Sequence, residues 1–164
     1  MIMRTLLALV LLMLPTLVHA QGSERIVVLE AGIVSGKPGK LVPAPGTATG
    51  FTREIDDFKL MKRTDTIVAK QGVRFGMRFR VERTPPGKLI KARCITRFPA
   101  DGVTNPKGMK VQVDEYDCDL RLGDVTWRSY TFDDSWEMVP GDWTLEFWLE
   151  GRKIGEKRFT IVKP

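Results

Sequence analysis

Residues 73–81 read Val-Arg-Phe-Gly-Met-Arg-Phe-Arg-Val. Every odd position carries an apolar side chain, and every even position carries arginine or glycine. Successive side chains of a β-strand point to opposite faces, so this alternation is typical of a strand with one face in the core and the other in water. The stretch therefore predicts a half-buried β-strand.

The same period of two residues continues toward the C-terminus. Turn-forming dipeptides such as Pro85-Pro86, Gly123-Asp124 and Pro140-Gly141 separate the segments that carry it. The pattern predicts further strands at residues 89–98, 109–119, 125–132, 143–149 and 154–162. We expect residues 73–81 to form a hairpin with 89–98, and the last two strands to form a closing hairpin.

The N-terminal third has a weaker pattern. Strands are predicted at residues 25–34, 53–60 and 66–70, and the Pro- and Gly-rich residues 36–50 are predicted to form a loop. No segment has the period of an amphipathic helix. The predicted fold is therefore all-β, an immunoglobulin-like antiparallel β-sandwich of about seven to nine strands.

The last strand contains a conflict of parity. Ile154 occupies an even position, whereas Phe159 and Ile161 occupy odd ones. A regular strand cannot bury both sets on one face, so we predict a β-bulge near Gly155 that shifts the register.

The first twenty residues have the three parts of a signal peptide. Arg4 supplies a positive charge, residues 6–14 are almost entirely apolar, and Val18-His19-Ala20 offers a cleavage site before Gln21. The alternative is a membrane anchor, but the apolar run is short and Pro15 ends it. We expect residues 1–20 to be removed, with no stable membrane insertion, which leaves a periplasmic or secreted protein.

The remaining residues 21–164 are expected to form a single domain. His19 is the only histidine, so the exported chain would lack the base of Ser-His-Asp and Cys-His catalysis and the imidazole ligands of common zinc sites. No cofactor and no metal are predicted. The net charge falls from +6 to +5 when Arg4 is removed, and outside the cytoplasm nucleic acid is not an expected partner.

Cys94 and Cys118 are the only cysteines and are predicted to form one disulfide. If they face each other on neighbouring antiparallel strands, Arg93 lies opposite Asp119 and Arg97 lies opposite Glu115. Opposite charges then meet twice, which favours this register. A bridge between the two sheets remains an alternative.

Two charged segments are candidate sites. The acidic run from Asp114 to Asp119 is interpreted as a strand face paired to arginines, with a calcium site as the alternative. A basic face is a candidate for binding phosphate or acidic polysaccharide, although such residues also suit the solvated side of a sandwich. It comprises Arg74, Arg78, Arg80, Lys91, Arg93 and Arg97.

The connection at residues 133–142 is a further candidate site. Trp136 lies near Asp133, Asp134 and Glu137, a composition that suits sugar stacking or a protein-binding hot spot. The alternative is that Trp136 plugs one end of the sandwich. Asp133 and Asp134 with Glu137 could also supply the two catalytic carboxylates of a glycosidase.

The C-terminal part of the chain resembles a known bacterial family. The run from Phe132 to Thr144, with its Pro-Gly-Asp-Trp turn, leads into Glu146-Phe147-Trp148 and a closing strand at residues 157–162. These motifs, with Ala31-Gly32-Ile33 and residues 72–75, are similar to the domain of unknown function 3859. The resemblance implies the sandwich fold and an exported location, and it implies no activity, substrate or site.

The sequence favours a protein that is not an enzyme. The first hypothesis is a periplasmic non-catalytic binding or accessory domain whose partner is an unknown envelope protein. The second is a binder of anionic envelope glycan or lipopolysaccharide. The third is a carboxylate-dependent hydrolase.

Overall fold

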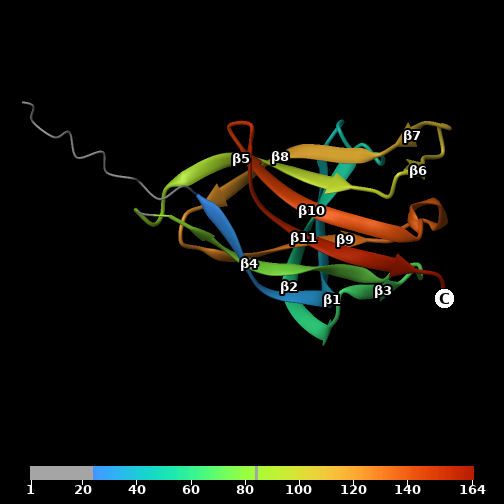
Figure 1. Ribbon diagram of the computed structural model, residues 1–164, viewed down its shortest axis with the longest axis horizontal. Helices are drawn as coiled ribbons and strands as arrows, with labels where there is room; N and C mark the ends of the chain where they lie inside the picture. The colour runs from blue at the N-terminus through green and yellow to red at the C-terminus, as the bar shows by residue number, and fades with distance from the viewer. Residues whose placement is uncertain (1–23, 84) are drawn as a thin grey trace, which may run out of the picture.

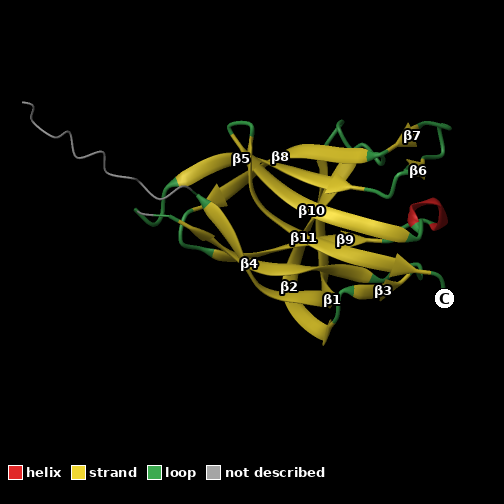
Figure 2. Ribbon diagram, in the orientation of Figure 1, coloured by secondary structure: helices red, strands yellow, loops and turns green. Residues whose placement is uncertain are grey.

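The computed structural model describes residues 24–83 and 85–164, so the predicted signal peptide at residues 1–20 lies outside the described part. The described residues form eleven strands and one 3-10 turn (Figure 2). Eight of these strands have seven residues or more. None of the described helices is long and apolar enough to cross a membrane. The predicted all-β sandwich is confirmed.

The longer strands form two sheets that pack face to face (Figure 1). Sheet A has the order β2-β1-β4-β9, and sheet B has the order β3-β11-β10-β5-β8. All pairings are antiparallel except β3 with β11. The elements are β1 (Arg25–Pro43), β2 (Phe51–Arg63), β3 (Thr66–Val68), β4 (Arg74–Glu82), β5 (Leu89–Arg97), β6 (Val103–Thr104), β7 (Lys110–Val111), β8 (Val113–Arg121), β9 (Val125–Thr131), η1 (Ser135–Glu137), β10 (Gly141–Leu149) and β11 (Arg152–Val162).

The core lies between the inner faces of the two sheets. The odd positions of β4 from Phe75 to Val81 are fully buried, as the alternation predicts. They pack against the odd positions of β10, and the rings of Phe79 and Phe147 lie 4.6 Å apart. Burial of such large apolar side chains is the main driving force for the fold.

The predicted hairpin between residues 73–81 and 89–98 is wrong. β4 pairs with β1 and β9 in sheet A, whereas β5 pairs with β10 and β8 in sheet B. Both strands carry one apolar face, but a period of two fits neighbours in one sheet and strands that face each other across the core equally well. Here the two strands lie in different sheets. The chain between them therefore crosses from one sheet to the other. The closing hairpin of β10 and β11 is confirmed.

The disulfide between Cys94 and Cys118 is confirmed, but the predicted register around it is wrong by two residues. Cys118 lies opposite Ala92, and Arg93 lies opposite Asp117. The bridge joins diagonal positions whose Cα atoms are 5.9 Å apart, within the usual span of a disulfide. A shift of two residues leaves every side chain on its own face, so the apolar pattern does not distinguish the two registers.

The predicted β-bulge near Gly155 is confirmed, and Ile154 is the extra residue. The register of β10 with β11 shifts between Phe147, which pairs with Gly155, and Trp148, which pairs with Lys153. Ile154, Phe159 and Ile161 are all buried as a result. A Cβ atom at residue 155 would lie 2.3 Å from Cβ of Ile26, so the glycine lets β1 of sheet A approach β11 of sheet B.

The prediction of a loop at residues 36–50 is wrong for its first half. β1 continues to Pro43 and pairs with β2, with three irregularities in register that accommodate the Gly and Pro residues. Only residues 44–50 form a turn. We call residues 34–60 the arm, because β1 pairs with β4 only as far as Ile33.

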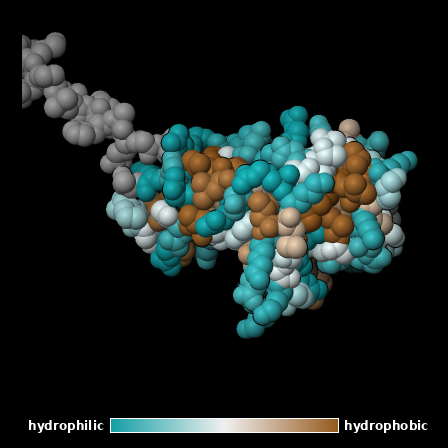
Figure 3. Space-filling view, turned by 90° about the horizontal axis from the view of Figure 1, so that it is seen from below, coloured by the Kyte–Doolittle hydropathy of each residue, from teal (hydrophilic) through white to brown (hydrophobic). Residues whose placement is uncertain are grey.

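The arm crosses from sheet A to the far edge of sheet B. In Figure 1 it passes behind the sandwich from the lower edge, near β4, to its turn near β8, and in the space-filling view it is a mostly hydrophilic lobe (Figure 3). The Glu115 N–H donates to the carbonyl oxygen of Gly46 at 2.9 Å, which ties the turn to β8. Phe58 stacks on Trp127 of β9 at 5.3 Å. The arm therefore bridges the open edge between β8 and β9.

Candidate functional site

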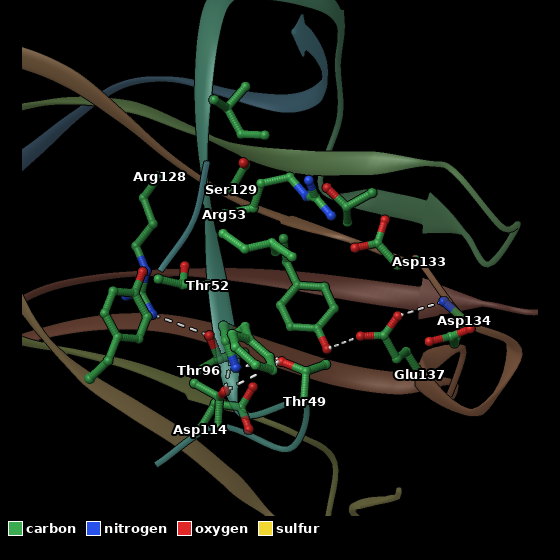
Figure 4. A pocket seen from close by; sticks show the side chains of 17 residues that line it. Thr49, Thr52, Arg53, Thr96, Asp114, Arg128, Ser129, Asp133, Asp134 and Glu137 are labelled. Atoms are coloured by element: carbon green, nitrogen blue, oxygen red, sulfur yellow. Dashed lines mark hydrogen bonds between the residues drawn. The ribbon is translucent and has the colours of Figure 1, made fainter. Parts of the chain in front are cut away.

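A cavity of about 500 Å³ lies beneath the arm. Its walls come from the arm, from β8 and β9, and from the segment that leads into η1. We call it the arm cavity (Figure 4). Its charged lining residues are Arg53, Asp114, Arg128, Asp133, Asp134 and Glu137. Its size falls within the range of cavities that hold small ligands, about 300–1,000 Å³.

Asp114 projects into the arm cavity from the inner face of β8 and is only 5% exposed. One carboxylate oxygen accepts a hydrogen bond from the N–H of Ala48 at 2.7 Å. Among the described residues its other oxygen accepts none. Burial raises the pKa of Asp114 to about 6; the Ala48 bond and Arg128 lower it, while Glu137 raises it further.

Glu137 is 2% exposed, and both of its carboxylate oxygens are occupied. One accepts from the hydroxyl of Tyr130 at 2.8 Å, and the other accepts from the N–H of Asp134 at 2.8 Å. Burial raises the pKa of Glu137 despite these bonds. Its side chain therefore fixes η1 against β9.

Arg128 is a buried cation on β9. It donates to the carbonyl oxygen of Glu146 and to Oγ1 of Thr96 at 3.1 Å, and its guanidinium lies 5.1 Å from the centre of the Phe147 ring. Burial lowers its pKa. These contacts engage the guanidinium with sheet B and join the two sheets beneath the cavity.

Arg74 holds the arm in place beside the arm cavity, and apolar side chains of the arm lie at the cavity's rim. Arg74 donates to Oγ1 of Thr131 at 2.7 Å and to the carbonyl oxygen of Gly36 at 2.9 Å, which holds the arm to sheet A. Burial lowers the pKa of Arg74, nearby Asp133 raises it, and Arg53 lowers it. Leu41 and Phe51 of the arm are about half exposed at the rim.

The structure brings together three residues of the connection that the sequence singled out. Asp133, Asp134 and Glu137 line the arm cavity, whereas Trp136 does not. Trp136 packs against the core, and its buried Nε1 has no hydrogen-bond partner among the described residues. This placement matches the alternative in which Trp136 plugs one end of the sandwich.

The predicted basic face is not one surface. Arg78 and Arg80 lie on β4 in sheet A, whereas Lys91, Arg93 and Arg97 lie on β5 in sheet B. The sequence placed them together because it placed both strands in one hairpin. Most of these arginines have acidic neighbours: Arg78 with Glu30 at 3.5 Å, Arg80 with Glu82 at 2.9 Å, Arg93 with Glu115 at 3.5 Å, and Arg97 with Glu146 at 2.9 Å.

The acidic run is divided between the two faces of β8. Asp114 is buried beneath the arm, while Glu115, Asp117 and Asp119 are exposed. The sequence singled out the acidic run as a whole, with a calcium site as the alternative. It did not separate Asp114 from the other acids, although Asp114 has the same parity as the disulfide-bonded Cys118. No group of three or more His, Cys, Asp or Glu within residues 24–83 and 85–164 could hold a metal ion.

Replacing Asp114 with asparagine should stabilise the protein at pH 7. Between about pH 4 and pH 6 the folded carboxyl keeps a proton that the unfolded chain has lost, so stability falls as pH rises through this range. The charged groups that act on it are Arg128 of β9 and Glu137 of η1. Asn retains the acceptor for Ala48 without the charge, and we expect a gain of about 1–2 kcal/mol above pH 6.

Urea unfolding at pH 4, 5, 6 and 7 measures this effect. Asp101→Asn is the matched control, because it removes the same charge from an exposed loop position. Two results for Asp114→Asn would contradict the raised pKa of Asp114. One is lower stability than the parent at pH 7, and the other is the same dependence of stability on pH as the parent between pH 4 and 6.

Comparison with known proteins supports the fold. A family model described as "Domain of unknown function (DUF3859)" matches residues 27–161. No curated protein matches the chain. Among solved structures, an immunoglobulin-like protein from Pseudomonas aeruginosa, PA1606, is 21% identical with a TM-score of 0.51, over 87% of this chain and 99% of that one. The alkylpurine DNA glycosylase AlkC of Pseudomonas fluorescens, bound to DNA with an abasic site analog, has a TM-score of only 0.38 at 19% identity, over 60% of this chain and 27% of that one.

Proposed function

This chain belongs to the family of the domain of unknown function DUF3859, and from that premise we propose that it is a non-catalytic binding module that acts in the periplasm or outside the cell. The observation that carries the proposal is the arm cavity, where Asp114 is buried with one oxygen unpartnered. A buried carboxyl with a raised pKa lowers stability at neutral pH, and such groups are concentrated at functional sites.

The chemistry of the arm cavity supports binding rather than catalysis. Catalysis by a carboxylate pair needs one group to give a proton while the other acts as base or nucleophile. Both oxygens of Glu137 are bonded within the protein, and Arg128 is engaged with sheet B. Among the buried acids of residues 24–83 and 85–164, Asp114 is the one with a carboxylate oxygen that accepts no hydrogen bond within the chain.

Export is supported by two independent features. The Cys94–Cys118 disulfide suits an oxidising compartment, because cytosolic thiols are kept reduced. The pattern of residues 1–20 is that of a signal peptide.

A protein partner is supported by the rim of the arm cavity. Leu41 and Phe51 leave large apolar side chains half exposed on the arm, and such residues beside polar groups are typical of protein contacts. An anionic glycan finds less support, because Arg78, Arg80, Arg93 and Arg97 lie within 4 Å of acidic side chains.

Photo-crosslinking tests this function. A photoreactive amino acid at Phe51 should capture a discrete protein in the native envelope, whereas the same group at Leu89 should not. Leu89 is the matched control, because it is 49% exposed against 50% for Phe51 and does not line the arm cavity. Capture of the same proteins from both positions, or of nothing from residue 51, would contradict the proposal.

A further inference from the structure

We propose that the arm cavity takes a basic side chain, lysine or arginine, from a peptide segment of the partner, with an apolar neighbour of that side chain resting on Leu41 and Phe51. The inference rests on the proposed binding function and names the chemistry that the site recognises.

The first argument is the charge of the cavity lining. Asp114, Asp133, Asp134 and Glu137 supply four carboxylates, while Arg53 and Arg128 supply two cations. Arg128 donates to two neutral acceptors, the Glu146 carbonyl oxygen and Thr96, so it keeps its charge, and the carboxylates outnumber the cations by four to two. The chain as a whole has a net charge of +6, so the arm cavity is a negative region on a positive protein and favours a cationic group.

The second argument is the unpartnered oxygen of Asp114. Ala48 supplies one hydrogen bond to this largely buried carboxylate, and the second oxygen, which is not fully buried, is open to the arm cavity. An ammonium or guanidinium group would supply another, and such charge-assisted bonds are about twice as strong as neutral ones. An anionic ligand would instead face Asp114 and Asp133 with like charge.

The third argument is the apolar wall that the arm presents to the same cavity. Leu41, Phe51 and Ile55 line it. The carbon stem of lysine or arginine packs on apolar surface while its charged end reaches a polar partner. The wall therefore suits a peptide with apolar neighbours better than a small free amine, which has no such contact to make.

The probe for this inference is the peptide acetyl-Ala-Leu-Lys-Leu-Ala-amide, titrated at pH 7.5 into the isotopically labelled protein and followed by amide NMR shifts. We expect a saturable shift of the Ala48 amide, which donates to Asp114. The same peptide with Nε-acetyl-lysine should bind at least about tenfold more weakly, a difference of about 1.4 kcal/mol or more.

Protein variants locate the interaction. Asp114→Asn should weaken the lysine peptide at least about tenfold, whereas Asp101→Asn, which removes the same charge at an exposed position away from the arm cavity, should not. A fold check on both variants by their amide spectra ensures that loss of binding is not loss of structure.

Several outcomes would overturn the inference. These are equal binding of the acetylated peptide, unchanged binding to Asp114→Asn, the absence of any shift, or binding of 1,4-diaminobutane as tight as that of the peptide, which would make a small free amine the occupant. If crosslinking from residue 51 still captures a partner, the proposed function stands and only its chemistry is wrong. If neither experiment succeeds, both fail.

Discussion

Trp143→Ala should lower the free energy of unfolding by about 3–5 kcal/mol, the usual range for removing a core aromatic side chain. Trp143 is fully buried at the start of β10. Its ring lies 4.6 Å from that of Phe98, 5.0 Å from Tyr130 and 5.6 Å from Phe132. Aromatic pairs of this kind add to the energy of burial, and the loss approaches the total stability of many small domains.

The indole of Trp143 also holds the segment that leads from η1 into β10. Its Nε1 donates to the carbonyl oxygen of Val139 at 2.9 Å. The Ala variant leaves that carbonyl oxygen without this partner and leaves a cavity beneath Tyr130, whose hydroxyl positions Glu137. We therefore expect the arm cavity to lose its shape together with the core.

Urea unfolding of the oxidised protein measures the effect. Trp127→Ala is the control, since it removes the same ring from a half-buried position on β9, where it stacks on Phe58 of the arm. A midpoint for Trp143→Ala at or above that of Trp127→Ala would show that the core assignment is wrong.

Removing the disulfide should cost about 3 kcal/mol, the second large effect. Cys94 and Cys118 are 24 residues apart in sequence, and closing a loop of this size restricts the unfolded chain. The double replacement Cys94→Ala with Cys118→Ala avoids placing a hydroxyl in the core, where Cys94 is buried. Treatment of the parent protein with a reducing agent should give a loss of the same size.

Comparing the reduced parent with the double Ala variant separates the effect of the disulfide bond from the effect of removing the cysteine side chains. We expect the reduced parent and the double variant to have similar urea midpoints, both well below that of the oxidised parent. Equal midpoints with and without the reducing agent would contradict a stabilising role, because β5 and β8 would then be held by their hydrogen bonds and packing alone.

Much of the fold was predictable because its signals are local. The alternation of residues 73–81 predicts the strand and its buried face, and the change of parity between Ile154 and Phe159 predicts the bulge near Gly155. The two cysteines predict their own pairing. The strand and the bulge are each determined by residues that are close together in sequence. The disulfide follows because the chain has only two cysteines.

Other features depended on contacts between distant segments. A period of two determines which face a side chain is on, but a shift of two residues leaves the faces unchanged, so the register of β5 with β8 was not determined. The same period does not say which sheet a strand joins, and β4 and β5 joined different ones. Residues 36–43 are strand because β2 supplies a partner whose pairing accommodates their glycines.

The candidate site shows the same division. The sequence determined that the connection would carry Asp133, Asp134 and Glu137, and that His19 would be the only histidine. Only the tertiary structure decided that Asp114 joins these three acids beneath the arm, and that Trp136 does not line the cavity. The physical reason is that burial and the resulting rise in the pKa of Asp114 come from the arm, whose Ala48 lies 66 positions away in sequence.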